Sequence, residues 1–280
     1  MRWNARQFEW DLSQRCLIMG IVNVTPDSFS DGGRYLDTEA ALTHARRLVD
    51  EGADILDIGG ESTRPGADPV GVDEECRRVL PAIEALAKEF PQVALSIDTS
   101  KAAVARSATE AGAAIINDVT GLKGDPDMAG VAADCGAGLV LMHMQGEPRT
   151  MQAAPVYKNA VAEIAAFLEC QGRLAVEAGV ARECLAFDPG IGFGKGLDHN
   201  LQILKRLDAF QCYGQPVLLG VSRKSFIGKL LGEDEIEMRQ WPTIALTSHA
   251  VEQGVRIVRV HDVLPNVQAT RMTEAIVRAT

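Results

Sequence analysis

The sequence predicts an α/β protein of the (β/α)8 TIM-barrel class, folded as a single domain over residues 1–280. Eight short apolar runs alternate with segments of helical periodicity, which favours parallel strands joined by helical crossovers. Each run is nearly continuously apolar, as expected for a strand that is covered on both faces. A length of 280 residues suits one such barrel, and no linker rich in Pro, Gly or Ser divides the chain.

The predicted strands are rich in Val, Ile and Leu. They cover residues 17–24, 54–60, 93–99, 113–119, 138–143, 185–190, 216–222 and 255–262. Eight strand–helix units favour a closed barrel, while an open, doubly wound sheet is the alternative arrangement of the same alternation.

The predicted helices lie between these runs. In the first of them, 37–54, Leu42, Ala45, Leu48 and Val49 share one face, and Gly52 is a stop signal. The others cover 73–90, 100–112, 125–136, 156–179, 199–210, 243–254 and 263–278, with a short helix at 225–232. Pro81 is expected to kink or restart the second helix, because proline removes a backbone donor.

Composition excludes several classes of function. Aromatic residues are only 5% of the chain, so the core is expected to consist of Ala, Val, Ile and Leu. A net charge of −10 argues against nucleic-acid and anionic-membrane partners. No apolar run is long enough to span a membrane, and the N-terminus lacks the apolar region of a secretory signal. The six cysteines form no C-x-x-C motif and are interpreted as buried, reduced thiols of a cytoplasmic protein.

Polar residues follow all eight predicted strands. They are Asn23, Glu61, Asp98, Asn117 with Asp118, His143, Asp188, the segment 222–224, and Arg259 with His261. One polar residue at a strand end is usually a helix cap, but polar residues at every strand end predict a shared site, because barrels of this class place their active site at the carboxyl ends of the strands. We therefore expect these side chains to converge on one mouth.

The residue types suggest one site for a neutral heterocycle. Asp98, Asn117 and Asp188 provide two carboxylates and an amide, which suit the N–H groups and acceptors of a pterin or purine edge. A buried carboxylate is costly without such a partner. For Asp98 the alternative is a simple cap of the helix that begins near residue 101.

The same strand ends also offer two anion sites. Arg64, Arg259 and His261 suit phosphate oxygens, and the amide oxygen of Asn23 suits Mg²⁺. The segment 222–225 opens a short helix whose free N–H groups favour an anion. The glycine-rich run 188–196 has neither the P-loop nor the Rossmann spacing and is interpreted as a loop that approaches a ligand closely.

Eight motifs reveal a family resemblance. They are MGIVNVTPDSFSDGG at 19–33, DIGGESTRPG at 57–66, SIDTSK at 96–101, IINDVTGL at 115–122, LMHMQGEPRTMQ at 141–152, FDPGIGFGK at 187–195, GVSRKSFIG at 220–228 and VRVHDV at 258–263. In these stretches the sequence resembles the dihydropteroate synthase family, the folate-pathway transferases that sulfonamides inhibit. The resemblance implies a TIM barrel, Mg²⁺, a homodimer, and condensation of 6-hydroxymethyl-7,8-dihydropterin diphosphate with 4-aminobenzoate.

The resemblance also assigns roles to residues. It implies pterin contacts for Asp98, Asn117, Asp188 and Lys224, and diphosphate contacts for Arg259, His261 and the Mg²⁺ ligand Asn23. It implies that Asp31, Thr63, Arg64 and Pro65 lie in loops that close over the substrates, and that Phe193 and Ser225 bind 4-aminobenzoate. Lys224, Asp31, Arg259 and His261 are thereby the expected catalytic residues.

Two other functions remain open at this point. A pterin-binding methyltransferase would share the carboxylates of the pterin edge, but it would not need Arg259, His261 or the helix start at 222–225. A catalytically inactive paralogue that binds pterin should have lost Asn23, Lys224 or Arg259, and all three are present.

Overall fold

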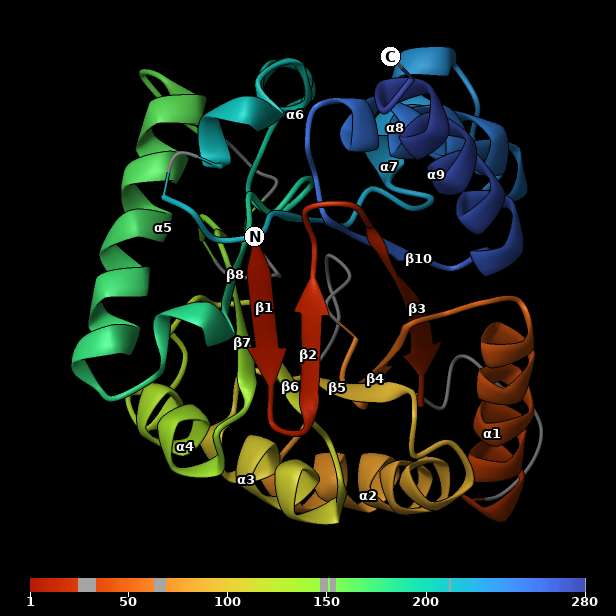
Figure 1. Ribbon diagram of the computed structural model, residues 1–280, viewed down its shortest axis with the longest axis vertical. Coiled ribbons are helices and arrows are strands. Elements are labelled where there is room, and N and C mark those ends of the chain that lie inside the picture. Colours follow the sequence, from red (N-terminus) through yellow and green to blue (C-terminus); the bar gives the residue numbers. More distant parts are fainter. Residues whose placement is uncertain (25–33, 63–68, 147–150, 152–154, 212, 280) are drawn as a thin grey trace.

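Eight parallel strands form the centre of the molecule, and helices surround them (Figure 1). The structure is a computed structural model and describes residues 1–24, 34–62, 69–146, 151, 155–211 and 213–279. Within these residues the strands are β3 (Leu17–Asn23), β4 (Ile55–Gly59), β5 (Ala94–Asp98), β6 (Ile115–Asp118), β7 (Gly138–Met142), β8 (Leu185–Asp188), β9 (Leu218–Leu219) and β10 (Ile257–Val260).

The helices follow the strands in the alternation that the sequence predicts. They are α1 (Arg34–Asp50), α2 (Val72–Glu89), α3 (Ala102–Ala111), α4 (Met128–Cys135), α5 (Ala160–Glu177), α6 (Leu197–Lys205), α7 (Ser225–Leu231), α8 (Gln240–Glu252) and α9 (Val263–Val277). Short 3-10 helices lie at Arg182–Cys184, Leu207–Phe210 and Glu237–Arg239. Helix α2 continues through Pro81 without a break.

The sheet closes on itself, which excludes the open, doubly wound alternative. Parallel pairing runs in the order β8-β7-β6-β5-β4-β3-β10-β9. The two ends of this order meet, because Phe187 of β8 pairs with Val217, next to β9, and its N–H donates to the carbonyl of Pro216 over 2.9 Å. The result is the predicted (β/α)8 barrel. Strand β9 is shorter than the predicted run 216–222, because only Leu218 and Leu219 pair with β10.

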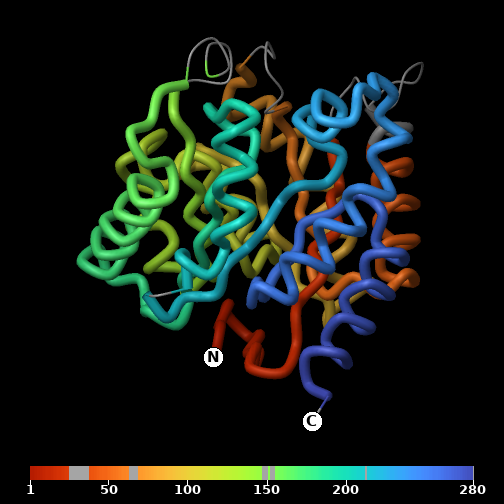
Figure 2. Tube along the Cα trace, turned by 90° about the horizontal axis from the view of Figure 1, so that it is seen from above, coloured from red at the N-terminus to blue at the C-terminus, as the bar shows by residue number. Residues whose placement is uncertain are grey.

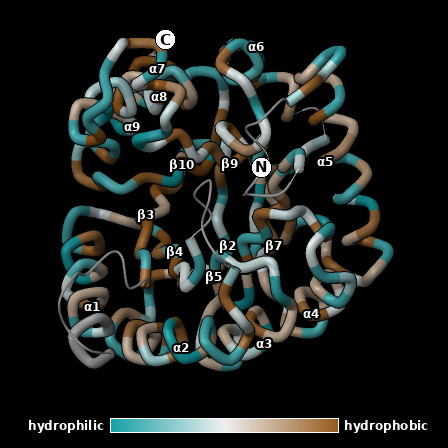
Figure 3. The backbone as a smooth tube through the Cα atoms, turned by 180° about the vertical axis from the view of Figure 1, so that it is seen from behind, coloured by the Kyte–Doolittle hydropathy of each residue, from teal (hydrophilic) through white to brown (hydrophobic). Residues whose placement is uncertain are grey.

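Two apolar layers fill the fold, one inside the barrel and one between strands and helices. The interior layer includes Leu17, Met19, Ile55, Val140 and Leu218. The outer layer joins the opposite faces of the strands to the helices through small aliphatic residues such as Ile18, Leu56 and Ala105. In Figure 3 the backbone of β3 and β10 is mainly brown, whereas the surrounding helices alternate between brown and teal. The scarcity of aromatic residues fits this aliphatic packing.

An N-terminal hairpin closes the bottom of the barrel and was not predicted. Strands β1 (Arg2–Ala5) and β2 (Phe8–Asp11) pair antiparallel and cross the barrel axis in Figure 1. Trp3 is fully buried in the interior layer, its indole N–H donates to the carbonyl of Cys184 over 3.1 Å, and its ring stacks on Trp10. Two of the three tryptophans therefore seal the end of the barrel where the strands begin.

Two predictions from the sequence concern membrane-spanning segments and the burial of the cysteines. No helix in the described part of the chain is sufficiently long and apolar to cross a membrane. The cysteines with described side chains are all free thiols, but only Cys16 is buried and Cys170 is exposed. The expectation of buried cysteines is thus wrong for most of these positions. Figure 2 shows both chain termini at the same end of the barrel.

Candidate active site

Strand periodicity places a polar layer above the apolar interior of the barrel. Successive residues of a strand point to opposite faces, so every second residue shares a face. Counting in steps of two from the interior residues Leu17, Ile55, Ala94, Ile115, Ala186 and Ile257 reaches Asn23, Asp57, Asp98, Asn117, Asp188, Arg259 and His261. These polar residues therefore face the inside of the barrel at the carboxyl ends of the strands, as predicted for the site.

The strand register brings four of these positions into one row. Asn23 lies beside Gly59, Gly59 beside Asp98, and Asp98 beside Asn117. Gly59 adds no side chain to this row, where a Cβ atom would lie 3.6 Å from Asp98 Cβ and 3.9 Å from both Asn23 Oδ1 and Asp98 Oδ2. Two oxygen atoms from different strands therefore flank a position without a side chain.

Arg259 connects this row to a deeper carboxylate. Its Nε donates to Oδ2 of Asp57 over 2.5 Å, and its Nη2 donates to Oδ2 of Asp98 over 2.7 Å. Asn117 Nδ2 donates to the same Asp57 oxygen over 3.1 Å. Asp57 is fully buried, whereas 20% of the Arg259 side chain is exposed. Within the described residues Nη1 of Arg259 has no hydrogen-bond partner, so the guanidinium can be paired below and still donate to an anion above.

Burial and neighbouring charges shift the pKa values of Arg259 and Asp98 in opposite directions. Burial would lower the pKa of Arg259, but Asp57 and Asp98 raise it above its usual value, so the guanidinium stays charged. Burial raises the pKa of Asp98, while Arg259 partly reverses that shift. A ligand that donates N–H groups to Asp98 would replace the missing hydration of its carboxylate.

Asp188 lies on the neighbouring side of the mouth. Its side chain is largely buried, and Oδ1 accepts from the N–H of Gly190 over 2.7 Å. Burial raises the pKa of Asp188 to about 6, and this N–H acts against the shift. Gly220 opens space between it and Arg259, since a Cβ there would lie 4.0 Å from Asp188 Oδ2 and 3.9 Å from Arg259 Cβ. Oδ2 of Asp188 has no hydrogen-bond partner in the described part of the chain and can accept from a planar ligand.

Lys224 and Phe193 form a cation–π pair at the rim. The Lys224 ammonium lies 3.9 Å from the centroid of the Phe193 ring. Gly192 has a φ of +83°, and a Cβ there would lie 3.3 Å from Lys224 Cδ, so glycine permits both this turn and the close approach. Burial, followed by Arg259, lowers the pKa of Lys224 to about 8. Ser225 is exposed and is the first residue of α7.

His261 completes the mouth beside Arg259. Its Nδ1 lies 2.9 Å from Ser222 Oγ, and its backbone N–H donates to the same hydroxyl over 3.2 Å. Arg223, which follows Ser222, binds Asp262 with two N–H groups over 3.0 and 2.6 Å. The guanidinium of Arg223 is therefore engaged with a carboxylate at the strand ends.

Three of the predicted strand-end residues do not join the site. Asp118 has the opposite strand parity, and its carboxylate accepts from the backbone N–H groups of Thr120 and Leu122. His143 also has the outward parity and packs edge-on against Phe167, with ring centroids 4.9 Å apart. Glu61 forms an ion pair with Lys101. The expectation that every strand end converges on the mouth is therefore wrong at these positions.

Asp57 and Lys195 also lie at or beside the site, although neither was predicted there. Asp57 is the one charged residue within the apolar run 55–59, and this exception to the pattern could have identified it. Lys195 is almost fully buried, and its ammonium binds His143 Nδ1, the His143 carbonyl and the Phe193 carbonyl over 3.0, 3.1 and 2.9 Å. Lys195 thus supports the loop that carries Phe193.

Asp31, Thr63, Arg64 and Pro65 lie outside the described residues. Among the described residues, no group of three or more His, Cys, Asp or Glu side chains could hold a metal ion by itself. Within the described residues, a cation at Asn23 would therefore not be held by a cluster of such side chains.

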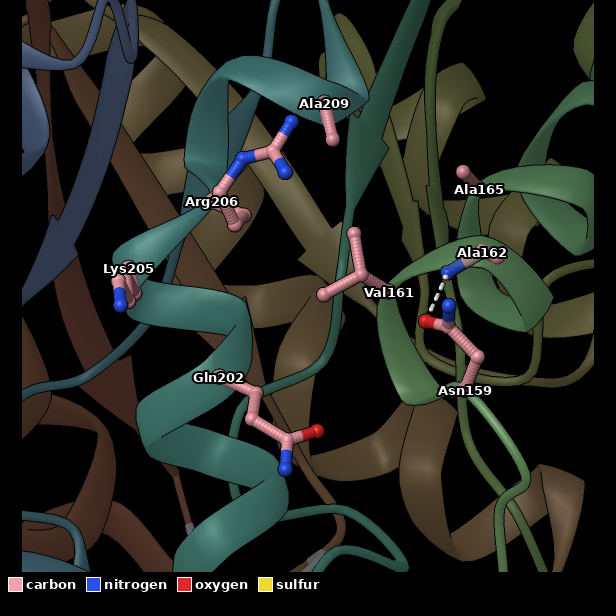
Figure 4. A pocket seen from close by; sticks show the side chains of 8 residues that line it. All are labelled: Asn159, Val161, Ala162, Ala165, Gln202, Lys205, Arg206 and Ala209. Carbon is pink, nitrogen blue, oxygen red and sulfur yellow. Dashed lines mark hydrogen bonds between the residues drawn. The ribbon is translucent and has the colours of Figure 1, made fainter.

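One cavity lies outside the barrel, between α5 and α6 (Figure 4). Its volume is about 530 Å³, and its lining includes Asn159, Gln202 and Arg206 but no carboxylate. The Asn159 side chain accepts from Ala162 N–H as the cap of α5, and Arg206 pairs with Asp208. Asn159 and Arg206 therefore already have partners in the protein, and the lining lacks the carboxylates found at the mouth.

Comparisons with known proteins agree with this geometry. Residues 19–261 match the family described as "Pterin binding enzyme". The dihydropteroate synthase of Escherichia coli K12 is 47% identical over 262 residues, which cover 94% of this chain and 92% of that protein. The chain belongs to the dihydropteroate synthase family. Family members are transferases, and this protein is an enzyme of that class.

Solved structures of dihydropteroate synthases share the complete fold. One from Xanthomonas albilineans with 4-aminobenzoic acid is 44% identical, with a TM-score of 0.93, and covers 100% of this chain and 99% of that one. A second from the same organism, in complex with 7,8-dihydropteroate, is 42% identical, with a TM-score of 0.90 and complete coverage of both chains. The barrel therefore matches dihydropteroate synthases from the first strand to the last.

Proposed function

We propose that this protein condenses 6-hydroxymethyl-7,8-dihydropterin diphosphate with 4-aminobenzoate to give 7,8-dihydropteroate and pyrophosphate, in the biosynthesis of tetrahydrofolate. The observation that carries the proposal is the inward cluster of Asp98, Asn117 and Asp188 beside Arg259 and Lys224. This cluster offers acceptors for a ring edge directly next to cations for a phosphate. Membership of the dihydropteroate synthase family supports both halves of that assignment.

The pterin ring is assigned to the buried acceptors. Asp188 and Asp98 would accept from the ring N–H groups, and Asn117 would present its amide oxygen, since its Nδ2 is already bound to Asp57. Lys224 would reach the pterin from the rim. Burial of both carboxylates favours a ligand with several N–H donors, because each carboxylate then recovers the hydrogen bonds that it lost from water.

The diphosphate is assigned to the opposite side of the mouth. Arg259 retains Nη1 for a phosphate oxygen. His261 follows Arg259 by two residues, directly after the end of β10. The side-chain oxygen of Asn23 fits Mg²⁺, which prefers oxygen ligands and usually shares its coordination with substrate phosphates and water. When bound, Mg²⁺ would neutralise part of the charge on the leaving diphosphate. Asn23 is half-buried, and its Oδ1 lies beside Gly59, which adds no side chain of its own to the row.

The reaction is proposed as a dissociative substitution at the pterin methylene carbon. The bond from this carbon to the diphosphate oxygen breaks, and its electron pair leaves with pyrophosphate. The electron-rich dihydropterin stabilises the cation that develops on the carbon. The amine of 4-aminobenzoate then forms the new carbon–nitrogen bond and loses one proton. Arg259 and His261 would stabilise the charge that grows on the leaving group, and the pterin carboxylates would favour the cationic ring.

The second substrate is assigned to the rim. Phe193 would pack on the ring of 4-aminobenzoate, and Ser225, which is exposed at the start of α7, would bind its carboxylate. Asp31, Thr63, Arg64 and Pro65 are assigned to the loops that close over both substrates. Exclusion of water would protect the cation from hydrolysis.

The test is a direct assay of the two substrates. Pyrophosphate release from the pterin diphosphate, 4-aminobenzoate and Mg²⁺ together, inhibited by a sulfonamide, is the expected result. Pterin binding without pyrophosphate release would instead support an inactive paralogue. Methyl transfer from methyl-tetrahydrofolate to a corrinoid would support the methyltransferase alternative. Omission of Mg²⁺ should abolish or strongly reduce the rate if Asn23 holds the ion.

We also propose that the protein is a cytoplasmic homodimer, formed through the side of the barrel that carries α7, α8 and α9. Helices α8 and α9 pack together, and this region exposes the apolar residues Leu231, Met238, Trp241, Met272 and Ile276. Trp241 is 73% exposed, which is unusual for so large an apolar side chain. Trp241→Glu should convert a dimer into a monomer in light-scattering measurements, while Val176→Glu on the distant α5 should not.

A further inference from the structure

Ser222 makes two contacts with one histidine at the mouth. Its side chain follows β9 and is 5% exposed. The backbone N–H of His261 donates to Ser222 Oγ over 3.2 Å, and Nδ1 of the same histidine lies 2.9 Å from that oxygen. The hydroxyl of Ser222 is thus held between the main chain and the ring of His261.

The direction of the hydrogen bond between Ser222 Oγ and His261 Nδ1 follows from the donor and acceptor groups of a hydroxyl. A hydroxyl has one proton and two lone pairs, and a buried hydroxyl that does not donate is costly. One lone pair of Ser222 Oγ accepts the backbone N–H of His261. Throughout the described residues, the one acceptor within hydrogen-bond distance of the hydroxyl proton is His261 Nδ1. Nδ1 is therefore the acceptor, and in the neutral imidazole the proton must lie on Nε2.

Burial and the nearby cations keep the His261 ring neutral. Burial is the main cause that lowers the pKa of His261 to about 3, and the nearby cations Arg259, Arg223 and Lys224 act in the same direction. Asp262 acts in the opposite direction. At neutral pH the ring is therefore an uncharged donor, and within the described residues no protein group is hydrogen-bonded to its Nε2.

The backbone around Ser222 is held in place by a neighbouring ion pair. Arg223 adopts a φ of 57°, a left-handed conformation that costs a residue with a side chain about 1–2 kcal/mol. Its two hydrogen bonds to Asp262 bind the turn after β9 to the turn after β10. The adjacent pairs Ser222–His261 and Arg223–Asp262 thus connect the same two turns. This connection fixes the position of the serine hydroxyl relative to the imidazole.

We propose that Ser222 is a positioning residue that holds His261 in its Nε2–H tautomer, so that a neutral imidazole donates this proton to a diphosphate oxygen. The inference rests on the proposed function for the identity of the anion, but the tautomer itself does not. A neutral N–H donor adds no further charge beside Arg259 and Lys224. It can also bind the leaving group without transferring a proton to it.

Nitrogen NMR of the intact protein tests the tautomer. The chain has five histidines, so the ¹⁵N signals of His261 are assigned by their loss in His261→Gln. At pH 7 the wild type should show one protonated nitrogen at Nε2 and an unprotonated Nδ1. Magnesium pyrophosphate should shift the Nε2 signal. A protonated Nδ1, or an imidazolium, in the free wild-type protein would overturn the proposal, whatever the enzymatic activity proves to be.

Variants separate positioning from a purely structural role. Ser222→Ala should give a mixture of the two tautomers and raise the KM for the pterin diphosphate roughly tenfold, with a smaller change in the KM for 4-aminobenzoate. Ser222→Thr, which keeps the hydroxyl, should restore the single tautomer. Thr247→Val is the matched control, because it removes another buried hydroxyl whose 2.7 Å bond to Asn266 does not touch His261. A single Nε2–H tautomer in Ser222→Ala would contradict the proposal.

Discussion

Arg259 Nε donates a 2.5 Å hydrogen bond to Oδ2 of Asp57, although 202 positions separate the two residues in the chain. The pair joins β4 to β10 across the intervening strand β3, beneath the proposed diphosphate position. Because Asp57 is fully buried, Arg259 is the cation that compensates its charge. The guanidinium therefore binds Asp57 within the barrel and is proposed to bind the diphosphate at the mouth. Substitution of Asp57 and substitution of Arg259 should have different effects.

Asp57→Ala should lower the free energy of unfolding by about 3 kcal/mol, because loss of one partner leaves a buried charge without full compensation. Urea denaturation monitored by circular dichroism measures this change. The control is Asp134→Ala, which removes the surface partner of Arg106 and should change stability by less than about 1 kcal/mol. Equal effects of the two substitutions would show that burial of Asp57 does not matter.

Arg259→Ala should weaken binding of the pterin diphosphate more than binding of the pterin alone. Loss of a charged hydrogen-bond donor to an anion costs about 2–5 kcal/mol, which predicts at least a 30-fold difference. Calorimetric titration with each ligand gives the comparison. An equal loss for both ligands would mean that Arg259 acts only by orienting Asp98.

Asp188→Asn should reduce pterin affinity by about ten- to a hundredfold, because a hydrogen bond to a charged group contributes roughly 1.5–3 kcal/mol. Affinity of the wild type should also fall as the pH decreases through about 6, where the raised pKa of Asp188 predicts protonation of the free carboxylate. Fluorescence titration with a pterin between pH 5 and 8 tests both statements. Unchanged pterin affinity in Asp188→Asn would remove this residue from the pterin contacts.

Deprotonation of Lys224 should determine the pH at which activity decreases on the alkaline side of the pH–activity profile. Its pKa is lowered to about 8, so the ammonium exists below this pH and is lost above it. Activity should therefore decrease as the pH rises through about 8, and Lys224→Ala should be severely impaired at every pH. Lys224→Arg retains charge at high pH and should move this limb upward, even with a lower maximal rate. A limb that stays near pH 8 in Lys224→Arg would assign it to another group.

The barrel could be predicted from the sequence because its determinants are local. Continuous apolar runs, helical periodicity and chain length all indicate it, and the parity of each strand places Asp98, Asn117 and Asp188 inside. The N-terminal hairpin could not be predicted in this way. Its turn contains Arg6, which adopts a φ of 53° without the Asn or Gly that normally marks such a turn.

The site was only partly predictable because its contacts are not local. The pairing of Arg259 with Asp57 depends on the pairing of both β4 and β10 with β3, and no spacing within the sequence indicates it. Asp118 and His143 are adjacent to strand ends and were expected at the mouth, but their parity directs them away from it. Strict application of the two-residue period to each strand would have avoided both errors and would have selected Asp57.

Lys195 provides a prediction that sequence reasoning did not suggest. Burial lowers the pKa of Lys195 to about 7, so between this pH and the usual lysine pKa the unfolded chain binds more protons than the folded one. Stability must then rise with pH over that interval, and the rise should disappear in Lys195→Met. The difference in unfolding free energy between wild type and Lys195→Met, measured in urea from pH 6 to 10, isolates this contribution from that of Lys224. The same variant should raise the KM for 4-aminobenzoate more than that for the pterin diphosphate, because Lys195 holds the carbonyl of Phe193. A difference that does not change with pH would show that Lys195 stays protonated throughout.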